Sequence, residues 1–167
     1  DAWNTRGVAL NEPSRYDDAL AGCQQALGIN PGHAQAWNTR GIALHDLGRF
    51  DEALASYDQA LKLKSDYADA WNNRGILLHE LRRPREALDD LARALTIAAD
   101  HAGAHYNAGI CRLAMDDFER GWEEYEWRWE YSMKEANPFP NTPKWGGEEN
   151  TQSLRVSAEQ GIGDQIL

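Results

Sequence analysis

A spacing of 34 residues recurs along the chain and limits what it can fold into more than any other feature. Tryptophan and glycine repeat at this spacing, at Trp3, Trp37 and Trp71 and at Gly7, Gly41, Gly75 and Gly109. Alanine repeats in the same way, at Ala19, Ala53 and Ala87 and at Ala26, Ala60 and Ala94. A fixed period of this length is typical of stacked helical repeats. The sequence therefore predicts an all-α solenoid in which each repeat contributes two antiparallel helices.

The repeat at 34–67 shows the local signals most clearly. Apolar residues three to four positions apart predict a first helix over 34–47, followed by a second helix over 50–63. Gly48 stands where a helix commonly ends, because glycine adopts the left-handed conformation without strain. Gly41 and the alanines of the second helix have little or no side chain, so they are expected to let the paired helices approach closely.

Three sequence features resemble the tetratricopeptide repeat family. Two lie in this repeat, the Trp-x3-Gly opening at Trp37 and Ala53 followed by Tyr57, and the third is Pro31 at the end of the preceding repeat. The resemblance implies a right-handed superhelix of four helix-turn-helix repeats, at about 1–33, 34–67, 68–101 and 102–133, plus a non-repetitive C-terminal tail. It also implies a non-catalytic scaffold for protein–protein interaction. Such a scaffold presents a concave groove to an extended peptide or a partner helix.

The copies depart from one another at a few positions. Pro13 is expected to end the first helix of the first repeat early. Asp17 and Asp18 match Asp51 and Glu52 of the central repeat and are expected, like them, in the first turn of a second helix. Arg40 and Arg74 occupy a position that is most often leucine in the family. Their stems can pack while the guanidinium reaches an acid or a carbonyl, but the pattern leaves that partner open.

Composition and charge exclude several classes of function. A formal net charge of −10 argues against non-specific binding of nucleic acid and against an anionic membrane surface. No apolar run approaches the roughly 18 residues of a membrane span, and without an export signal we expect a cytoplasmic protein. The chain begins with Asp1 and is interpreted as a fragment. Cys23 and Cys111 lie far apart in the sequence, so no disulfide framework is implied. Both fall at core-facing positions, where cysteine packs as a small hydrophobic residue.

The C-terminal tail differs from the repeats. Three prolines and two glycines in 132–152 predict a linker over 134–152, and alternation at Leu154, Val156 and Ala158 predicts a short strand. The segments FERGWEEYEWRWE, KWGG and SAEQGIGDQIL resemble bacterial proteins in which such repeats lead into a heptosyltransferase-like glycosyltransferase domain. By that resemblance, 153–167 is the truncated start of an α/β domain, and Asp164 beside Gly163 is a catalytic base only in a longer parent enzyme.

The resemblance leaves an alternative to the scaffold: an N-terminal region that positions the acceptor of a glycosyltransferase and is inactive as this fragment. The tail is also expected to allow homo-oligomers, since an isolated strand has unpaired backbone groups. The aromatic residues near Trp122 and Trp129 either seal the end of the solenoid, the interpretation favoured here, or form a platform for carbohydrate.

The candidate peptide-binding groove is carried over from the family, one position at a time along the first helix of each repeat. Its residues are Asn4, Val8, Asn11, Gln35, Asn38, Ile42, His45, Asp46, Asp69, Asn72, Ile76, His79, Glu80, Tyr106 and Ile110. Asn4, Asn38 and Asn72 form a column at one repeat position. Their amides can pair with a peptide backbone through both donor and acceptor, or asparagine can stand there merely because it is soluble and compatible with a helix. Asn73 and Asn107 match a second column that forms a ladder in some relatives.

The charge of these positions points to the ligand. They lack the lysine and arginine set that chaperone-binding members use for a terminal carboxylate, and Asp46, Asp69 and Glu80 favour a neutral or basic ligand. We expect no metal and no cofactor. His101 and His105 are four apart, as in a helical metal pair, but no matching carboxylate motif follows them.

Overall fold

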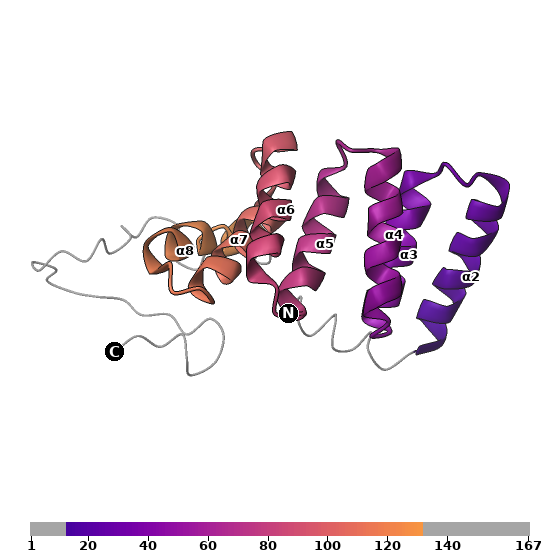
Figure 1. The fold of residues 1–167 in the computed structure, drawn as a ribbon, viewed down its shortest axis with the longest axis horizontal. Coiled ribbons are helices and arrows are strands. Elements are labelled where there is room, and N and C mark those ends of the chain that lie inside the picture. Colours follow the sequence, from indigo (N-terminus) through magenta and orange to yellow (C-terminus); the bar gives the residue numbers. More distant parts are fainter. Residues whose placement is uncertain (1–12, 132–167) are drawn as a thin grey trace, which may run out of the picture. The chain divides into compact units, whose positions relative to one another are not determined.

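The computed structural model describes residues 13–131, all of which lie in one compact unit spanning residues 1–135. Helices succeed one another along this part of the chain (Figure 1): α2 (Pro13–Ile29), α3 (Ala34–Asp46), α4 (Phe50–Leu63), α5 (Ala68–Glu80), α6 (Pro84–Ile97), α7 (Ala102–Leu113), α8 (Phe118–Tyr125) and α9 (Arg128–Tyr131). The predicted all-α solenoid is confirmed. The predicted linker at 134–152, the strand and the segment 153–167 lie outside the described residues.

Consecutive helices pack as antiparallel pairs, α3 with α4, α5 with α6 and α7 with α8, and each pair contacts the next. The second helix of the central repeat runs from Phe50 to Leu63 as predicted, and the first ends at Asp46, one residue before the predicted end. In the fourth repeat, α8 and α9 together fill the positions that α4 and α6 fill as single helices. Within residues 13–131, none of the helices has both the length and the apolar character that crossing a bilayer requires.

One prediction about the first repeat is wrong. Helix α2 begins at Pro13, so Asp17 and Asp18 lie in its second turn and the first turn carries no acid. The helix that Pro13 is expected to end lies outside the described residues. Proline is well suited to the first helical position, because the amide hydrogen it lacks has no partner there. Pro84 confirms the same rule at the start of α6.

Small residues at fixed repeat positions set the distance between paired helices. Ala53 and Ala87 are fully buried. A Cβ atom built on Gly41 would lie 2.5 Å from Cε1 of the buried Tyr57, and one on Gly75 would lie 3.0 Å from Cγ of Leu91. Real Cβ atoms do not approach as closely as the one at Gly41 would, and the contact at Gly75 would be tighter than most, so both glycines allow the paired helices to pack closely.

The turn between the two helices of a repeat has the same backbone conformation in three successive repeats. Gly48, Arg82 and Asp116 stand 34 residues apart and have φ values of 72°, 61° and 63°. After α3 the amide of Arg49 donates to the carbonyl of Leu44 at 2.8 Å, which is the hydrogen bond of a Schellman motif. The left-handed conformation costs an L-residue with a side chain about 1 kcal/mol.

Replacing Arg82 or Asp116 by glycine is therefore expected to stabilise the fold, while Gly48→Ala is expected to destabilise it. We expect each change to be about 0.5–1 kcal/mol, because part of the relieved strain is offset by the greater freedom of glycine in the unfolded chain. Urea denaturation of the three variants measures the effect. A lower free energy of unfolding for both Arg82→Gly and Asp116→Gly would contradict this account.

Candidate binding surface

The first helices of successive repeats, α3, α5 and α7, lie side by side and are called here the A-helix layer. Asparagine side chains link each helix of this layer to the next. Asn73 donates from Nδ2 to Oδ1 of Asn38 at 3.2 Å, and Asn107 donates in the same way to Asn72 at 2.9 Å. Asn38 and Asn72 are only 5% and 6% exposed. These two members of the expected ligand-binding column therefore join neighbouring repeats.

Histidine–carboxylate pairs form a second set of links in the A-helix layer. His45 Nε2 lies 2.8 Å from Oε2 of Glu80, between α3 and α5. His101 Nε2 lies 3.1 Å from Oδ1 of Asp69, between the start of α7 and α5. Because Nδ1 of His101 accepts the amide hydrogen of Ala104, its Nε2 carries the proton and donates to Asp69. Each junction of the layer thus has one amide link and one histidine link.

Other candidate residues remain accessible, most of them on α3 and α5 and one, Ile110, on α7. Gln35, Ile42, Asp69 and Glu80 are exposed, and Asp46, Ile76, His79 and Ile110 are partly exposed. Asn4, Val8 and Asn11 lie outside the described residues. The accessible set combines branched apolar side chains with carboxylates, and both kinds of group come from helices whose positions are fixed by the links described above.

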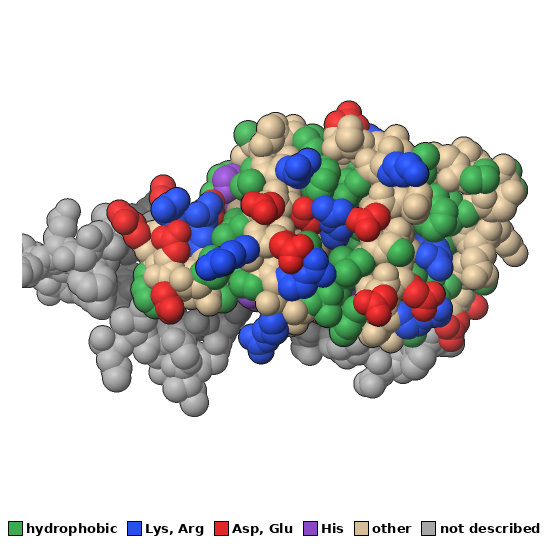
Figure 2. All heavy atoms as spheres, in the orientation of Figure 1, with side chains coloured by type: hydrophobic (Ala, Val, Ile, Leu, Met, Phe, Trp, Pro, Cys, Tyr) green, Lys and Arg blue, Asp and Glu red, His purple; other side chains and the backbone are tan. Residues whose placement is uncertain are grey.

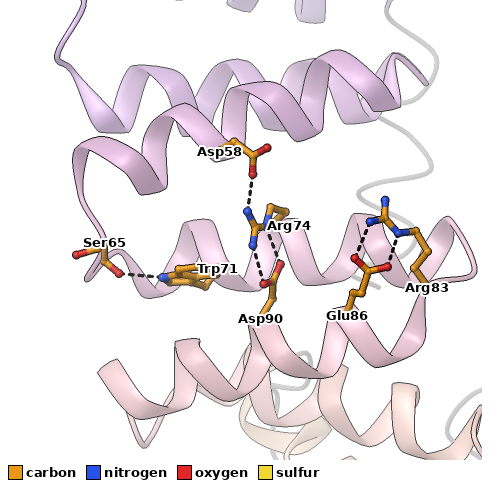
Figure 3. A network of polar contacts seen from close by, with 7 residues as sticks. All are labelled: Asp58, Ser65, Trp71, Arg74, Arg83, Glu86 and Asp90. Carbon is orange, nitrogen blue, oxygen red and sulfur yellow. Dashed lines mark hydrogen bonds and ion pairs between the residues drawn. The ribbon is translucent and has the colours of Figure 1, made fainter.

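The arginines of the A-helix layer are directed toward the second helices. Arg74 forms a two-point interaction with Asp90 of α6, with distances of 2.7 and 2.8 Å, and also pairs with Asp58 of α4 (Figure 3). Arg40 donates to Ser56 Oγ, at the repeat position that Asp90 occupies one repeat later. Arg112 pairs with Glu124 at 2.6 Å. These pairs identify the partners that the sequence pattern left open.

Aromatic side chains cover the last helix of the layer. Tyr106, a candidate groove residue, is 6% exposed, and its ring lies 5.3 Å from that of Tyr125 and 5.4 Å from that of Tyr131. The Trp127 ring stacks on His105 at 4.3 Å. Tyr125, Trp127 and Tyr131 therefore contact side chains of α7, while Trp122 is 52% exposed. The accessible candidate surface is concentrated on α3 and α5.

The histidines do not gather into a metal site in the described part of the chain. His101 is tied to Asp69, whereas His105 Nε2 lies 3.0 Å from the carbonyl oxygen of Ala99. Within residues 13–131, no group of three or more histidine, cysteine, aspartate or glutamate side chains is placed to hold a metal ion.

The two cysteines are buried and free, as the sequence predicts for small core residues. Burial raises the pKa of Cys111 from 9.0 to about 12, with Arg112 opposing the shift, and burial also raises the pKa of Cys23. Both thiols are therefore kept neutral by the fold at physiological pH. Neither is an activated nucleophile.

The raised pKa of Cys111 makes the stability of the fold dependent on alkaline pH. Its contribution is fully present below the ordinary thiol pKa of 9.0 and falls by up to about 1.4 kcal/mol per pH unit above it, until the folded-state pKa of about 12 is passed. Urea denaturation between pH 8 and pH 11 measures the slope. The slope should decrease in Cys111→Ala, which removes this ionisation, and an unchanged slope would contradict the prediction.

Comparisons with known proteins agree with this geometry. A family model described as a TPR repeat matches residues 41–81, and a tetratricopeptide repeat model matches residues 68–101. A comparison with curated protein sequences found no significant match.

Solved structures with the same fold include a crystal structure of MamA, with 23% identity and a TM-score of 0.62 over 71% of this chain and 68% of that chain. A second is the first TPR of Spaghetti (RPAP3) bound to the HSP90 peptide SRMEEVD, with 21% identity and a TM-score of 0.57 over 60% and 80% of the two chains. The two family models thus match tetratricopeptide repeats within residues 41–101, and the solved structures share the fold of paired, stacked helices.

Proposed function

We propose that the chain is a protein-interaction scaffold that binds a polypeptide segment on the accessible side of α3 and α5. The observation that carries the proposal is the exposure of Ile42, with the partly exposed Ile76 one repeat later, on helices that polar links hold in fixed register. A rigid apolar surface loses little conformational entropy when a ligand binds. The RPAP3 domain, which has the same fold, is bound to a peptide.

The ligand that suits this surface is neutral or basic. Helices α3, α5 and α7 contain no lysine, and their arginines are engaged by groups on the second helices. The cations needed to hold a terminal carboxylate are therefore lacking on these three helices. On the face shown in Figure 2, acidic and basic side chains alternate without forming a basic patch, which gives no support to nucleic acid as the partner.

The glycosyltransferase alternative and the oligomerisation through the tail both rest on residues that lie outside the described part of the chain. Asp164 and Gly163 belong to that tail. No observation within residues 13–131 favours either of them over the scaffold, so the scaffold is the function put forward here.

The test is binding of the 167-residue chain to a peptide array of mixed charge, followed by titration of the peptides that bind. Ile42→Ser is expected to weaken binding about tenfold, because it removes an exposed apolar contact. Ile97→Ser is the matched control, since Ile97 is exposed to a similar degree, 41% against 38%, but lies on the second helix α6. Failure to bind any peptide, or equal loss in both variants, would overturn the proposal.

A further inference from the structure

Helix α5 carries a line of three side chains that alternate in character. Asp69 lies in its first turn, Ile76 is seven residues later, and Glu80 is its last residue. At 100° per residue, positions 0, 7 and 11 fall on the same side of a helix. The two carboxylates are therefore separated by three turns, about 16 Å along the axis, with an apolar side chain between them.

A histidine that is less exposed than its partner contacts each of these carboxylates: His45 is buried and His101 is partly buried. The side chains of Asp69 and Glu80 are 67% and 45% exposed, whereas those of His101 and His45 are 18% and 7% exposed. Each histidine contacts one carboxylate oxygen, Oδ1 of Asp69 and Oε2 of Glu80. A carboxylate can accept about four hydrogen bonds, so a fixed acid can also accept from a cation in solution. The two acids are thus oriented before any ligand arrives.

The neighbouring helices do not repeat this arrangement. The positions of Asp69 and Glu80 are taken by Gln35 and Asp46 on α3, and on α7 by Gly103 and the adjoining Ala114. The isoleucine position is kept, as Ile42 and Ile110. The apolar row therefore crosses all three helices of the A-helix layer, while a pair of acids on one helix is found only on α5 within this layer.

We propose that the surface binds a basic amphipathic helix whose two cationic side chains, eleven residues apart, pair with Asp69 and Glu80. The apolar residues between these cations pack on Ile76 and Ile42. This inference rests on the proposed scaffold function and names the class of its ligand. A helix fits because eleven residues give the same separation of about 16 Å on one face. In an extended chain about five residues span that length, and residues five apart point to opposite faces.

Two synthetic 18-residue peptides of identical composition test the spacing. The first has lysine at positions 4 and 15 and isoleucine at 8 and 11; the second moves one lysine to position 10, on another face of the helix. Fluorescence anisotropy with the 167-residue chain is expected to show binding at least about tenfold tighter for the first peptide. A version with glutamate in place of both lysines is expected not to bind.

Variants of the chain connect this preference to the two acids. The double variant Asp69→Asn, Glu80→Gln should remove the preference for the first lysine peptide. Each new amide oxygen still accepts a hydrogen bond from its histidine, so the fold is kept. Asp51→Asn with Asp89→Asn is the control, because it changes the net charge equally at exposed positions on α4 and α6. Thermal unfolding confirms that both variants are folded.

The two proposals fail in different ways. Equal binding of the two lysine peptides, lost in Ile42→Ser, would overturn the charge spacing and leave the scaffold function standing. The control variant Asp51→Asn with Asp89→Asn could also weaken binding of the first peptide as much as Asp69→Asn with Glu80→Gln does. That result would overturn the charge spacing too, because binding would then depend only on the net charge of the chain. Absence of binding by these peptides and by every peptide of the array would overturn the scaffold function itself.

Discussion

Gly109→Ala is expected to lower the free energy of unfolding by about 3 kcal/mol and the melting temperature by roughly 10 °C. A Cβ atom at this position would lie 2.6 Å from the backbone nitrogen of Tyr125 and 3.0 Å from both the carbonyl carbon of Glu124 and the carbonyl oxygen of Gly121. All three atoms belong to the main chain of α8, so no side-chain rotation relieves the overlap. The fourth repeat must move apart or lose its last helix.

Gly22→Ala is the matched control and is expected to have the opposite sign. Gly22 is an exposed position inside α2, and a Cβ atom there would have no neighbour within 4 Å. Alanine is favoured over glycine inside a helix by about 0.5–1 kcal/mol, so this variant should be slightly more stable. Differential scanning calorimetry of both variants makes the comparison. A Gly109→Ala protein as stable as the parent chain would show that α7 and α8 are not in backbone contact.

The fold could be predicted from the sequence because its main signal is periodic. Helix boundaries predicted for one repeat apply to the other repeats at intervals of 34 residues. The second helix of the central repeat runs from Phe50 to Leu63, as predicted. The prediction for Asp17 and Asp18 was wrong because α2 begins at Pro13, a residue well suited to the first helical position, and this start places both acids one turn further along the helix.

The candidate site was harder to predict, because its contacts join repeats. The sequence predicts Asn38 as a ligand contact, and the structure adds a contact that the prediction did not include, a hydrogen bond that Asn38 accepts from Asn73. The same separation of 35 residues relates His45 to Glu80 and Asn72 to Asn107, so pairs of polar residues at this separation were a usable signal. The sequence holds no comparable signal for the contacts of Tyr106 with Tyr125 and Tyr131, because these contacts depend on the break between α8 and α9.

The ion pair between Arg74 and Asp90 links the two helices of the third repeat, and its loss is expected to be costly. The Asp90 side chain is 5% exposed and that of Arg74 is 22% exposed, and Asp58 supplies a second, more exposed partner from α4 (Figure 3). The pKa of Arg74 is raised, first by its hydrogen bond with Asp90. Asp90→Ala leaves a largely buried guanidinium with one partner, so we expect a loss of about 3 kcal/mol.

The preceding repeat supplies a natural comparison, because Ser56 stands at the position of Asp90 and accepts from Arg40. Asp90→Ser keeps one acceptor and should cost less than Asp90→Ala. Glu86→Ala breaks an ion pair of similar length with Arg83, but both side chains are about half exposed, so water replaces the lost partner and the effect should be much smaller. Urea denaturation should therefore rank the losses as Asp90→Ala, Asp90→Ser and Glu86→Ala. Equal losses for Asp90→Ala and Glu86→Ala would mean that burial adds nothing to the Arg74 pair, and that the junction of α5 and α6 is held by its apolar contacts alone.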